Sequence, residues 1–310
     1  MPTLPRDASP AGRRATVAFT DDWREDAARR DFTINALYAD PQTGEIFDYF
    51  GGLADLEKRH IRFIGDPLQR IAEDHLRILR FFRFLARFGG TPDAAALEAC
   101  TARANDLMAL SRERIRDELL KLLVAPDAVR VLQLMVERDI LKPVVPEIDA
   151  AGVERLAALA GHEAAAGLAP EPVRRLAAVL PPDPAVNEAV GARLKLSNAE
   201  RQALASAIRT DFAEGPLALA YRIGPDRAAD RLLLAGNAAG ARAVAGWTPP
   251  RLPLSGGALI GRGLSKGPDV AKALRRIEDR WIAEGFPDAD RAAQIADSVV
   301  DALLSRDSSA

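Results

Sequence analysis

Short apolar runs alternate with polar turn residues over the first sixty positions. Ile34–Tyr38 and Ile46–Phe50 are apolar runs that flank the turn-forming stretch Asp40–Gly44, and this arrangement predicts a β-hairpin. A further β-prone run covers residues 15–19, and the polar stretch 20–30 fits a loop or a short helix. So few strands predict a piece of a sheet and not a complete one.

From about residue 67 to the end, apolar residues recur at helical spacing. The pattern predicts one long helix over 71–88, which ends before the Gly89-Gly90 pair. Capping signals predict further helices: 112–124 after Ser111, one after Asp127, 198–208 opened by a Ser197–Glu200 capping box, and a last one opened by Pro268. The predicted fold class is therefore α+β, with a partial sheet at the N-terminus followed by a mostly helical chain.

Composition narrows the class of protein. The 310 residues are 48% hydrophobic and 28% charged, which excludes a disordered or fibrous protein. The formal net charge of −2 means that any RNA contact has to come from local basic patches. No apolar run approaches the length of a membrane helix or a signal region. The single cysteine and the three scattered histidines predict neither a disulfide nor a zinc site. We expect a cytoplasmic protein without a membrane partner.

A charged pair lies inside the apolar stripe of the predicted helix 71–88. On a helical wheel Asp74 and Arg77 fall among apolar residues, with Arg80 at the edge of the stripe. Arg83 falls on the far side, toward solvent or another domain. Asp74 and Arg77 are spaced for an ion pair at a helix start. Alternatively, since a carboxylate accepts hydrogen bonds and a guanidinium only donates them, the two match a base edge with an amine beside a ring acceptor. Cytosine and adenine present that edge, whereas guanine and uracil present the reverse.

A second candidate is the run Arg29–Leu37. Arg29 and Arg30 lead into an apparent strand or turn, and guanidinium groups bind triphosphate well. Asp31 and Asn35 are placed to bond ribose hydroxyls or to cap a helix. A solvated surface charge cluster would show the same residue types, so both interpretations stay open at this point.

Four segments follow one another in a fixed order: Arg29–Leu37, Phe47–Leu56, Glu73–Phe84 and Arg112–Leu123. They resemble the second to fifth motifs of class II tRNA nucleotidyltransferases, the CCA-adding enzymes, and of their poly(A) polymerase relatives. In that family the four are a nucleotide-binding motif, a flexible link, the nucleobase template and a neck helix. The resemblance runs from about Arg13 to Pro287.

The resemblance implies four parts: a partial nucleotidyltransferase head over 1–60, a helical neck with the nucleobase-binding helix over 61–125, a helical body over 126–248, and a helical RNA-binding tail over 249–310. It implies an enzyme that adds C, A or both to tRNA 3′ ends from CTP and ATP, with release of pyrophosphate. Body and tail would hold the acceptor arm and elbow of tRNA by the backbone, without sequence readout.

The resemblance also implies roles for single residues. Arg30 would contact the sugar and phosphates of the nucleotide, and Asp74 and Arg77 would hydrogen-bond the incoming base. Arg80 and Arg83 would contact phosphate or brace the template. The expected nucleotide-binding set is Arg30, Asp31, Asn35, Asp74, Arg77, Arg80 and Arg83.

The first motif of the family is not found in this sequence. It is a Gly-Gly followed by Arg-Asp and then an Asp-x-Asp, whose carboxylates hold two Mg²⁺ ions for attack of the tRNA 3′-hydroxyl on the α-phosphate. Mg²⁺ is thus the expected cofactor, with its ligands missing here. The Asp288-Ala289-Asp290 stretch follows a helix near the C-terminus, and we expect it to cap a turn.

Two explanations account for the missing motif: a start that is encoded further upstream, or a truncated paralogue. We favour the upstream start, because Phe32, Ile34 and Leu37 would leave apolar sheet surface uncovered without partner strands. The alternative functions are a poly(A) polymerase of the same family and a non-catalytic remnant that binds RNA or nucleotide.

Overall fold

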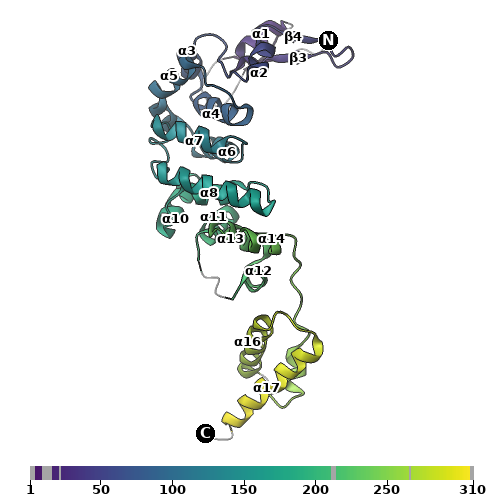
Figure 1. Cartoon of the computed structure of the whole chain (residues 1–310). Helices are drawn as coiled ribbons and strands as arrows, with labels where there is room; N and C mark the ends of the chain where they lie inside the picture. The colour runs from purple at the N-terminus through teal and green to yellow at the C-terminus, as the bar shows by residue number, and fades with distance from the viewer. Residues whose placement is uncertain (1–3, 9–15, 21, 211–213, 265–266, 308–310) are drawn as a thin grey trace. The chain divides into compact units, whose positions relative to one another are not determined.

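The computed structural model describes residues 4–8, 16–20, 22–210, 214–264 and 267–307. The chain divides into two compact units, Met1–Gly161 with Ala169–Ile208, and His162–Leu168 with Arg209–Ala310. Two small antiparallel sheets lie near the N-terminus and helices make up the rest (Figure 1), which confirms the α+β class. No helix in the described ranges is both long and apolar enough to span a membrane. The finer division into head, neck, body and tail stays a prediction.

The four strands form two hairpin pairs. β1 (Leu4–Ala8) pairs with β2 (Thr16–Thr20), and β3 (Leu37–Ala39) pairs with β4 (Ile46–Asp48). The predicted hairpin is confirmed, and in its turn the Asp40 carboxylate accepts from the backbone N–H groups of Gln42 and Thr43 at 2.7 and 3.0 Å. β3 begins later than the predicted strand because residues 33–35 form a 3-10 turn.

The helices of the first unit begin where the capping signals place them. Ser111 accepts from the N–H of Arg114 at the start of α6, and Ser197 and Glu200 form the predicted capping box. Asp127 is the N-cap residue of α7, but its carboxylate accepts from the Arg130 side chain and not from a backbone N–H, so the expected side-chain cap is wrong there. The elements are α1 (Trp23–Arg29), η1 (Thr33–Asn35), α2 (Gly52–Glu57), α3 (Pro67–Glu73), α4 (Leu76–Phe88), α5 (Ala94–Ala102), η2 (Ala104–Ala109), α6 (Arg112–Leu123), α7 (Ala128–Glu137), α8 (Ala150–Ala166), α9 (Pro172–Val179), α10 (Pro184–Arg193) and α11 (Asn198–Ala207). The last residues of α8, from His162 on, belong to the second unit.

The regular secondary structure in the described residues of the second unit is entirely helical. Pro268 opens α16 as predicted, and the core of this unit gathers around the buried Trp281 and Ile277. The helices are α12 (Pro216–Ile223), α13 (Pro225–Leu234), α14 (Ala238–Val244), α15 (Gly256–Ile260), α16 (Pro268–Ala283) and α17 (Ala289–Asp307).

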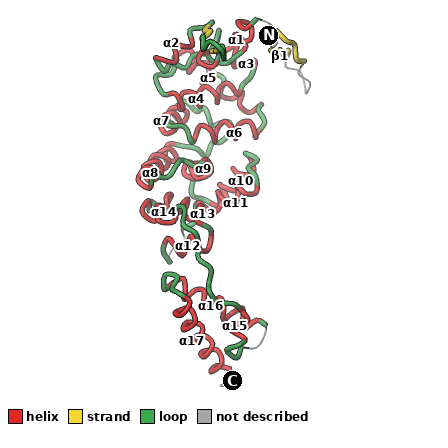
Figure 2. Tube along the Cα trace, turned by 90° about the vertical axis from the view of Figure 1, so that its right-hand side faces the viewer, coloured by secondary structure: helices red, strands yellow, loops and turns green. Residues whose placement is uncertain are grey.

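Helix α4 is the central element of the first unit. It packs against α3 on one side and against α6 and α7 on the other (Figure 2). Its apolar face is fully buried, with Ile78, Phe81, Phe82 and Leu85 at 0% exposure. Because α4 is held on several sides, the charged residues along it have fixed surroundings.

Candidate nucleotide-binding site

The helix predicted over 71–88 is broken in the middle. α3 ends at Glu73 and α4 begins at Leu76, with Asp74 in an extended conformation between them. The Asp74 carboxylate accepts from the N–H of Leu76 at 3.1 Å, and such a side-chain bond to the backbone competes with a continuous helix. The single long helix is therefore a wrong prediction, and a helical wheel drawn across the break misplaces the residues before it.

Asp74 and Arg77 lie on either side of this break, but they do not pair with each other. Oδ2 of Asp74 accepts from Arg114 of α6 at 2.8 Å, and its side chain is 35% exposed. Arg77 donates to Glu73 at 2.6 Å and to the backbone oxygen of Arg70 at 2.7 Å. The predicted ion pair between Asp74 and Arg77 is replaced by one ion pair for each residue.

The segment after α1 turns back onto α4 through Asp31. This carboxylate is buried and accepts from Nε of Arg80 at 2.5 Å, from Nδ2 of Asn35 at 3.0 Å, and from the N–H of Phe32 at 3.1 Å. Burial alone would raise the pKa of Asp31, but the hydrogen bond and charge of Arg80 outweigh it and hold the pKa below its ordinary value. Asp31 and Asn35 thus anchor the turn that presents Arg30.

Arg30 is the more exposed member of this group. Its guanidinium lies 3.3 Å from Asp26 and 3.4 Å from the backbone oxygen of Asn35, and 5.2 Å from the centre of the Tyr38 ring. The side chain is 42% exposed. Two weak contacts and partial exposure leave its donors available to an anionic ligand.

Arg83 differs from its prediction. Its Nε donates to the buried Glu118 of α6 at 2.5 Å, its guanidinium lies 4.6 Å from the Phe84 ring, and its side chain is only 17% exposed. It therefore points into the contact between α4 and α6 and not toward solvent, because α6 covers that side of α4.

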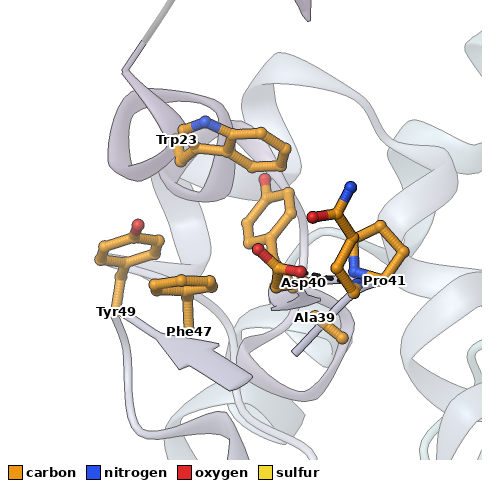
Figure 3. Close-up of a pocket in the computed structure, with 8 residues that line it drawn as sticks. Trp23, Ala39, Asp40, Pro41, Phe47 and Tyr49 are labelled. Atoms are coloured by element: carbon orange, nitrogen blue, oxygen red, sulfur yellow. Dashed lines mark hydrogen bonds between the residues drawn. The ribbon is translucent and has the colours of Figure 1, made fainter. Parts of the chain in front are cut away.

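An aromatic hollow opens beside strands β3 and β4 (Figure 3). Its volume is about 620 Å³, and Tyr38, whose ring lies under Arg30, is one of its walls. Its only charged lining residue is Asp40, so the hollow does not suit a triphosphate. The lining residues are Trp23, Tyr38, Ala39, Asp40, Pro41, Gln42, Phe47 and Tyr49.

Comparison with known proteins supplies the family. Residues 4–62 match the family described as "Poly A polymerase head domain", and residues 91–151 match "Probable RNA and SrmB- binding site of polymerase A". The mitochondrial CCA tRNA nucleotidyltransferase 1 of Homo sapiens is 32% identical over an alignment of 306 residues that covers 92% of this chain and 68% of that protein. The chain belongs to this family of nucleotidyltransferases.

Two further relatives show which parts of the chain are similar to known proteins. The Bacillus stearothermophilus CCA-adding enzyme, solved in complex with CTP, superposes with a TM-score of 0.69 at 25% identity and covers 95% of this chain and 78% of its own. Poly(A) polymerase I of Haemophilus influenzae is 37% identical over 131 residues, 42% of this chain and 29% of that protein. The fold is thus shared along nearly the whole chain.

Aromatic side chains of the first unit cover Phe32. Phe32 is fully buried and its ring centre lies 4.8 Å from that of Phe63 and 5.2 Å from that of Phe84. Ile34 and Leu37 are half-buried. The expectation that Phe32 leaves apolar surface uncovered is therefore wrong, because aromatic residues of α4 and of the preceding loop cover it.

Acidic residues of the described ranges do not assemble a metal site. These ranges contain no cluster of three or more His, Cys, Asp or Glu side chains suited to a metal ion. Asp288 accepts from the N–H of Arg291 at 3.0 Å at the start of α17, which confirms the expected cap. The described residues therefore supply no such cluster for the Mg²⁺ ions that the resemblance leads us to expect.

Three residues at the site escaped the sequence reasoning. Arg70, Glu73 and Arg114 hold the backbone and side chains of the candidate set. Glu73 precedes Arg77 by four residues, a spacing typical of a helical ion pair, so this signal was present. Arg70 precedes Glu73 by three residues, which is also a helical pair spacing, but its bonds to the backbone oxygens of Arg29 and Arg30 and the bond of Arg114 to Asp74 cross the fold and left no local signal.

Proposed function

We propose that this nucleotidyltransferase adds C and A to the 3′ ends of tRNA, taking CTP and ATP as substrates and releasing pyrophosphate. The proposal rests on two neighbouring side chains at the break between α3 and α4, one of which accepts hydrogen bonds while the other donates them. Asp74 presents acceptors and Arg77 presents donors. The edge of cytosine or adenine offers an amine and a ring acceptor, and these complement the pair.

Each proposed contact has a support in the structure. Asp74 accepts from the amine of the base, and Arg77 donates to the ring nitrogen. Arg30 donates to the phosphates, since its side chain is 42% exposed and makes only long contacts of 3.3 and 3.4 Å. Asp31, Asn35 and the mostly buried Arg80 and Arg83 support this arrangement from behind.

Base selection needs Arg77 to release part of its present bonds, which go to Glu73 and to the backbone oxygens of Arg70 and Arg29. Asp74 is held by Arg114 through one oxygen, Oδ2, while Oδ1 accepts only from a backbone N–H. A base amine can therefore reach this carboxylate without breaking the Arg114 contact. We infer that Arg114 and Glu73 orient the two reading groups.

The partners follow from the relatives. The mitochondrial relatives are named CCA tRNA nucleotidyltransferases, and solved neighbours include complexes with CTP and with ATP. We propose tRNA as the RNA partner, held along its acceptor arm and elbow by the helical body and tail. Mg²⁺ is the expected cofactor of the transfer, and the described residues contain no cluster of three or more His, Cys, Asp or Glu side chains that could hold it.

The test measures binding and incorporation with all four nucleoside triphosphates. The wild-type chain is expected to bind CTP and ATP more tightly than GTP and UTP, and Asp74→Ala and Arg77→Ala are expected to lose this preference while still binding tRNA. Asp127→Ala is the matched control, since Asp127 is also an aspartate at a helix start with an arginine partner. Equal binding of all four nucleotides by the wild type would refute the base-reading pair.

Incorporation separates the proposal from its alternatives. Addition of C and then A to tRNA lacking its terminal CCA supports a CCA-adding enzyme. Addition of A alone to an unrelated RNA end indicates a poly(A) polymerase, an alternative favoured by the Haemophilus influenzae relative. Binding of tRNA without incorporation indicates a non-catalytic nucleotide-binding protein.

A further inference from the structure

The C-terminal end of α1 is held by an arginine forty residues further along the chain. The last carbonyl groups of a helix have no partner within it, and a cation placed there is favourable. One amino nitrogen of Arg70 donates to the backbone oxygens of both Arg29 and Arg30, at 2.6 and 2.5 Å. The Arg70 guanidinium therefore holds the backbone that carries the Arg30 side chain, in addition to the contacts of Asp31 and Asn35 in the turn that follows.

The same guanidinium also holds the base-reading side. The other amino nitrogen of Arg70 donates to Oε2 of Glu73 at 2.5 Å, and that oxygen accepts from Arg77 at 2.6 Å as well. Arg77 further donates to the backbone oxygen of Arg70 at 2.7 Å and approaches that of Arg29 at 3.3 Å. Arg70 thus contacts both the segment that presents Arg30 and the groups that orient Arg77.

Burial makes this connection rigid. Arg70 is 9% exposed as a residue, and its Nε has no hydrogen-bond partner among the residues that the structure describes. Burying a charged group that is incompletely paired and lies near a second arginine costs stability. If the only role of Arg70 were to stabilise the fold, an apolar side chain of similar size would pack there without this cost.

We propose that Arg70 is a positioning residue that sets the distance and orientation of the phosphate-binding Arg30 relative to the base-reading pair Asp74 and Arg77. The proposal rests on the proposed function, because it takes a nucleoside triphosphate to be bound by both segments at once. A protein that binds a nucleotide through two groups distinguishes it well from other nucleotides only when the distance and orientation between those groups are fixed. Arg70 therefore contributes to base selection although it does not touch the base.

The experiment compares two arginine substitutions that remove similar contacts. Arg70→Met removes the link, and Arg155→Met is the matched control, because Arg155 donates to the backbone oxygens of Ala178 and Leu180 at the end of α9 at 2.9 and 3.0 Å. Dissociation constants for CTP, ATP, GTP and UTP are measured on the full chain by calorimetric titration, together with the melting temperature of each variant.

Both variants are expected to melt at lower temperature, since both lose a helix C-terminal cap. Selectivity is the ratio of the GTP and UTP dissociation constants to those of CTP and ATP. Only Arg70→Met is expected to lower this ratio, by about tenfold, because one charged hydrogen bond to the nucleotide is misplaced. Arg70→Lys keeps the charge but not the fork of donors, so its ratio is expected to lie between those of Arg70→Met and the wild type. If Arg70→Met does not fold, Arg70→Lys is judged by the same ratio.

The outcomes distinguish the two proposals. Wild-type selectivity in the folded Arg70 variants, with all four affinities reduced equally or not at all, would overturn the positioning role and leave the proposed function intact. A wild-type chain that does not prefer CTP and ATP would overturn the base-reading pair, and the positioning role with it. Loss of selectivity in Arg155→Met as well would show that any loss of stability has this effect, which also overturns the role of Arg70.

Discussion

Replacing Asp31 by alanine removes the carboxylate that holds the turn after α1 against α4. The Asp31 side chain is 5% exposed and accepts from Arg80 at 2.5 Å and from Asn35 at 3.0 Å. A hydrogen bond to a charged group contributes about 1.5–3 kcal/mol, and breaking a buried ion pair costs about 3–5 kcal/mol because the remaining charge loses its partner. Since the Arg80 side chain is 28% exposed and keeps part of its hydration, we expect a loss of about 2–3 kcal/mol.

This loss depends on pH in a direction set by the pKa of Asp31. Although burial opposes it, Arg80 holds that pKa below its ordinary value in the folded state. A carboxyl group of this kind stabilises the fold above its unfolded pKa of about 3.9, and the contribution disappears as the pH falls through the folded pKa. The difference between wild type and Asp31→Ala is therefore expected to be full at about pH 7 and to shrink below about pH 4.

Thermal unfolding followed by circular dichroism measures the difference. For a unit of 150–250 residues, about 1 kcal/mol shifts the melting temperature by about 2–4 °C, so Asp31→Ala is expected to melt about 4–12 °C lower at neutral pH. Asp127→Ala is the control, because the Asp127–Arg130 pair is exposed at 35% and 45% and contributes at most about 1 kcal/mol. A deficit in Asp31→Ala that stays the same at pH 3 and pH 7, or that does not exceed the control, would refute the reasoning.

Two further predictions concern packing and reactivity. Gly52→Ala is expected to destabilise the protein by about 1–3 kcal/mol, because an added Cβ would lie 2.3 Å from the Thr33 backbone oxygen. Urea unfolding measures this loss, and Gly161→Ala, whose Cβ would meet nothing within 4 Å, is expected to stabilise instead by up to about 1 kcal/mol; equal effects would contradict the packing argument. Burial raises the pKa of the Cys100 thiol, so iodoacetamide at pH 8 is expected to alkylate Cys100 only after unfolding. Mass spectrometry detects the adduct, and rapid alkylation of the native protein would show that the site opens.

Local sequence patterns determined much of the fold. The hairpin of β3 and β4, the cap of α6 at Ser111 and the capping box of α11 each depend on residues within a few positions of one another. Turn chemistry and caps act through the backbone of the same segment, so the sequence is enough to locate them.

Local sequence patterns predicted only part of the candidate site. The motif order pointed to Arg30, Asp74 and Arg77, and their residue types indicated what they could bind. Their present partners could not be read, because Asp74 bonds to Arg114 forty residues away and Arg80 bonds to Asp31 forty-nine residues away. The pattern of apolar and polar residues in one segment does not tell which distant segment packs against it.

Tertiary structure decided the rest. The break at Asp74, the burial of Phe32 under α4 and the position of Arg83 against Glu118 all run against what the local pattern predicted. Contacts between distant segments place Phe32 and Arg83. At the break, the local bond from the Leu76 N–H to Asp74 acts together with the distant contact of Arg114. Sequence alone therefore determined which groups are available for nucleotide chemistry, and packing of α3, α4 and α6 decided where those groups point, because orientation is set by the charges and surfaces that folding brings together.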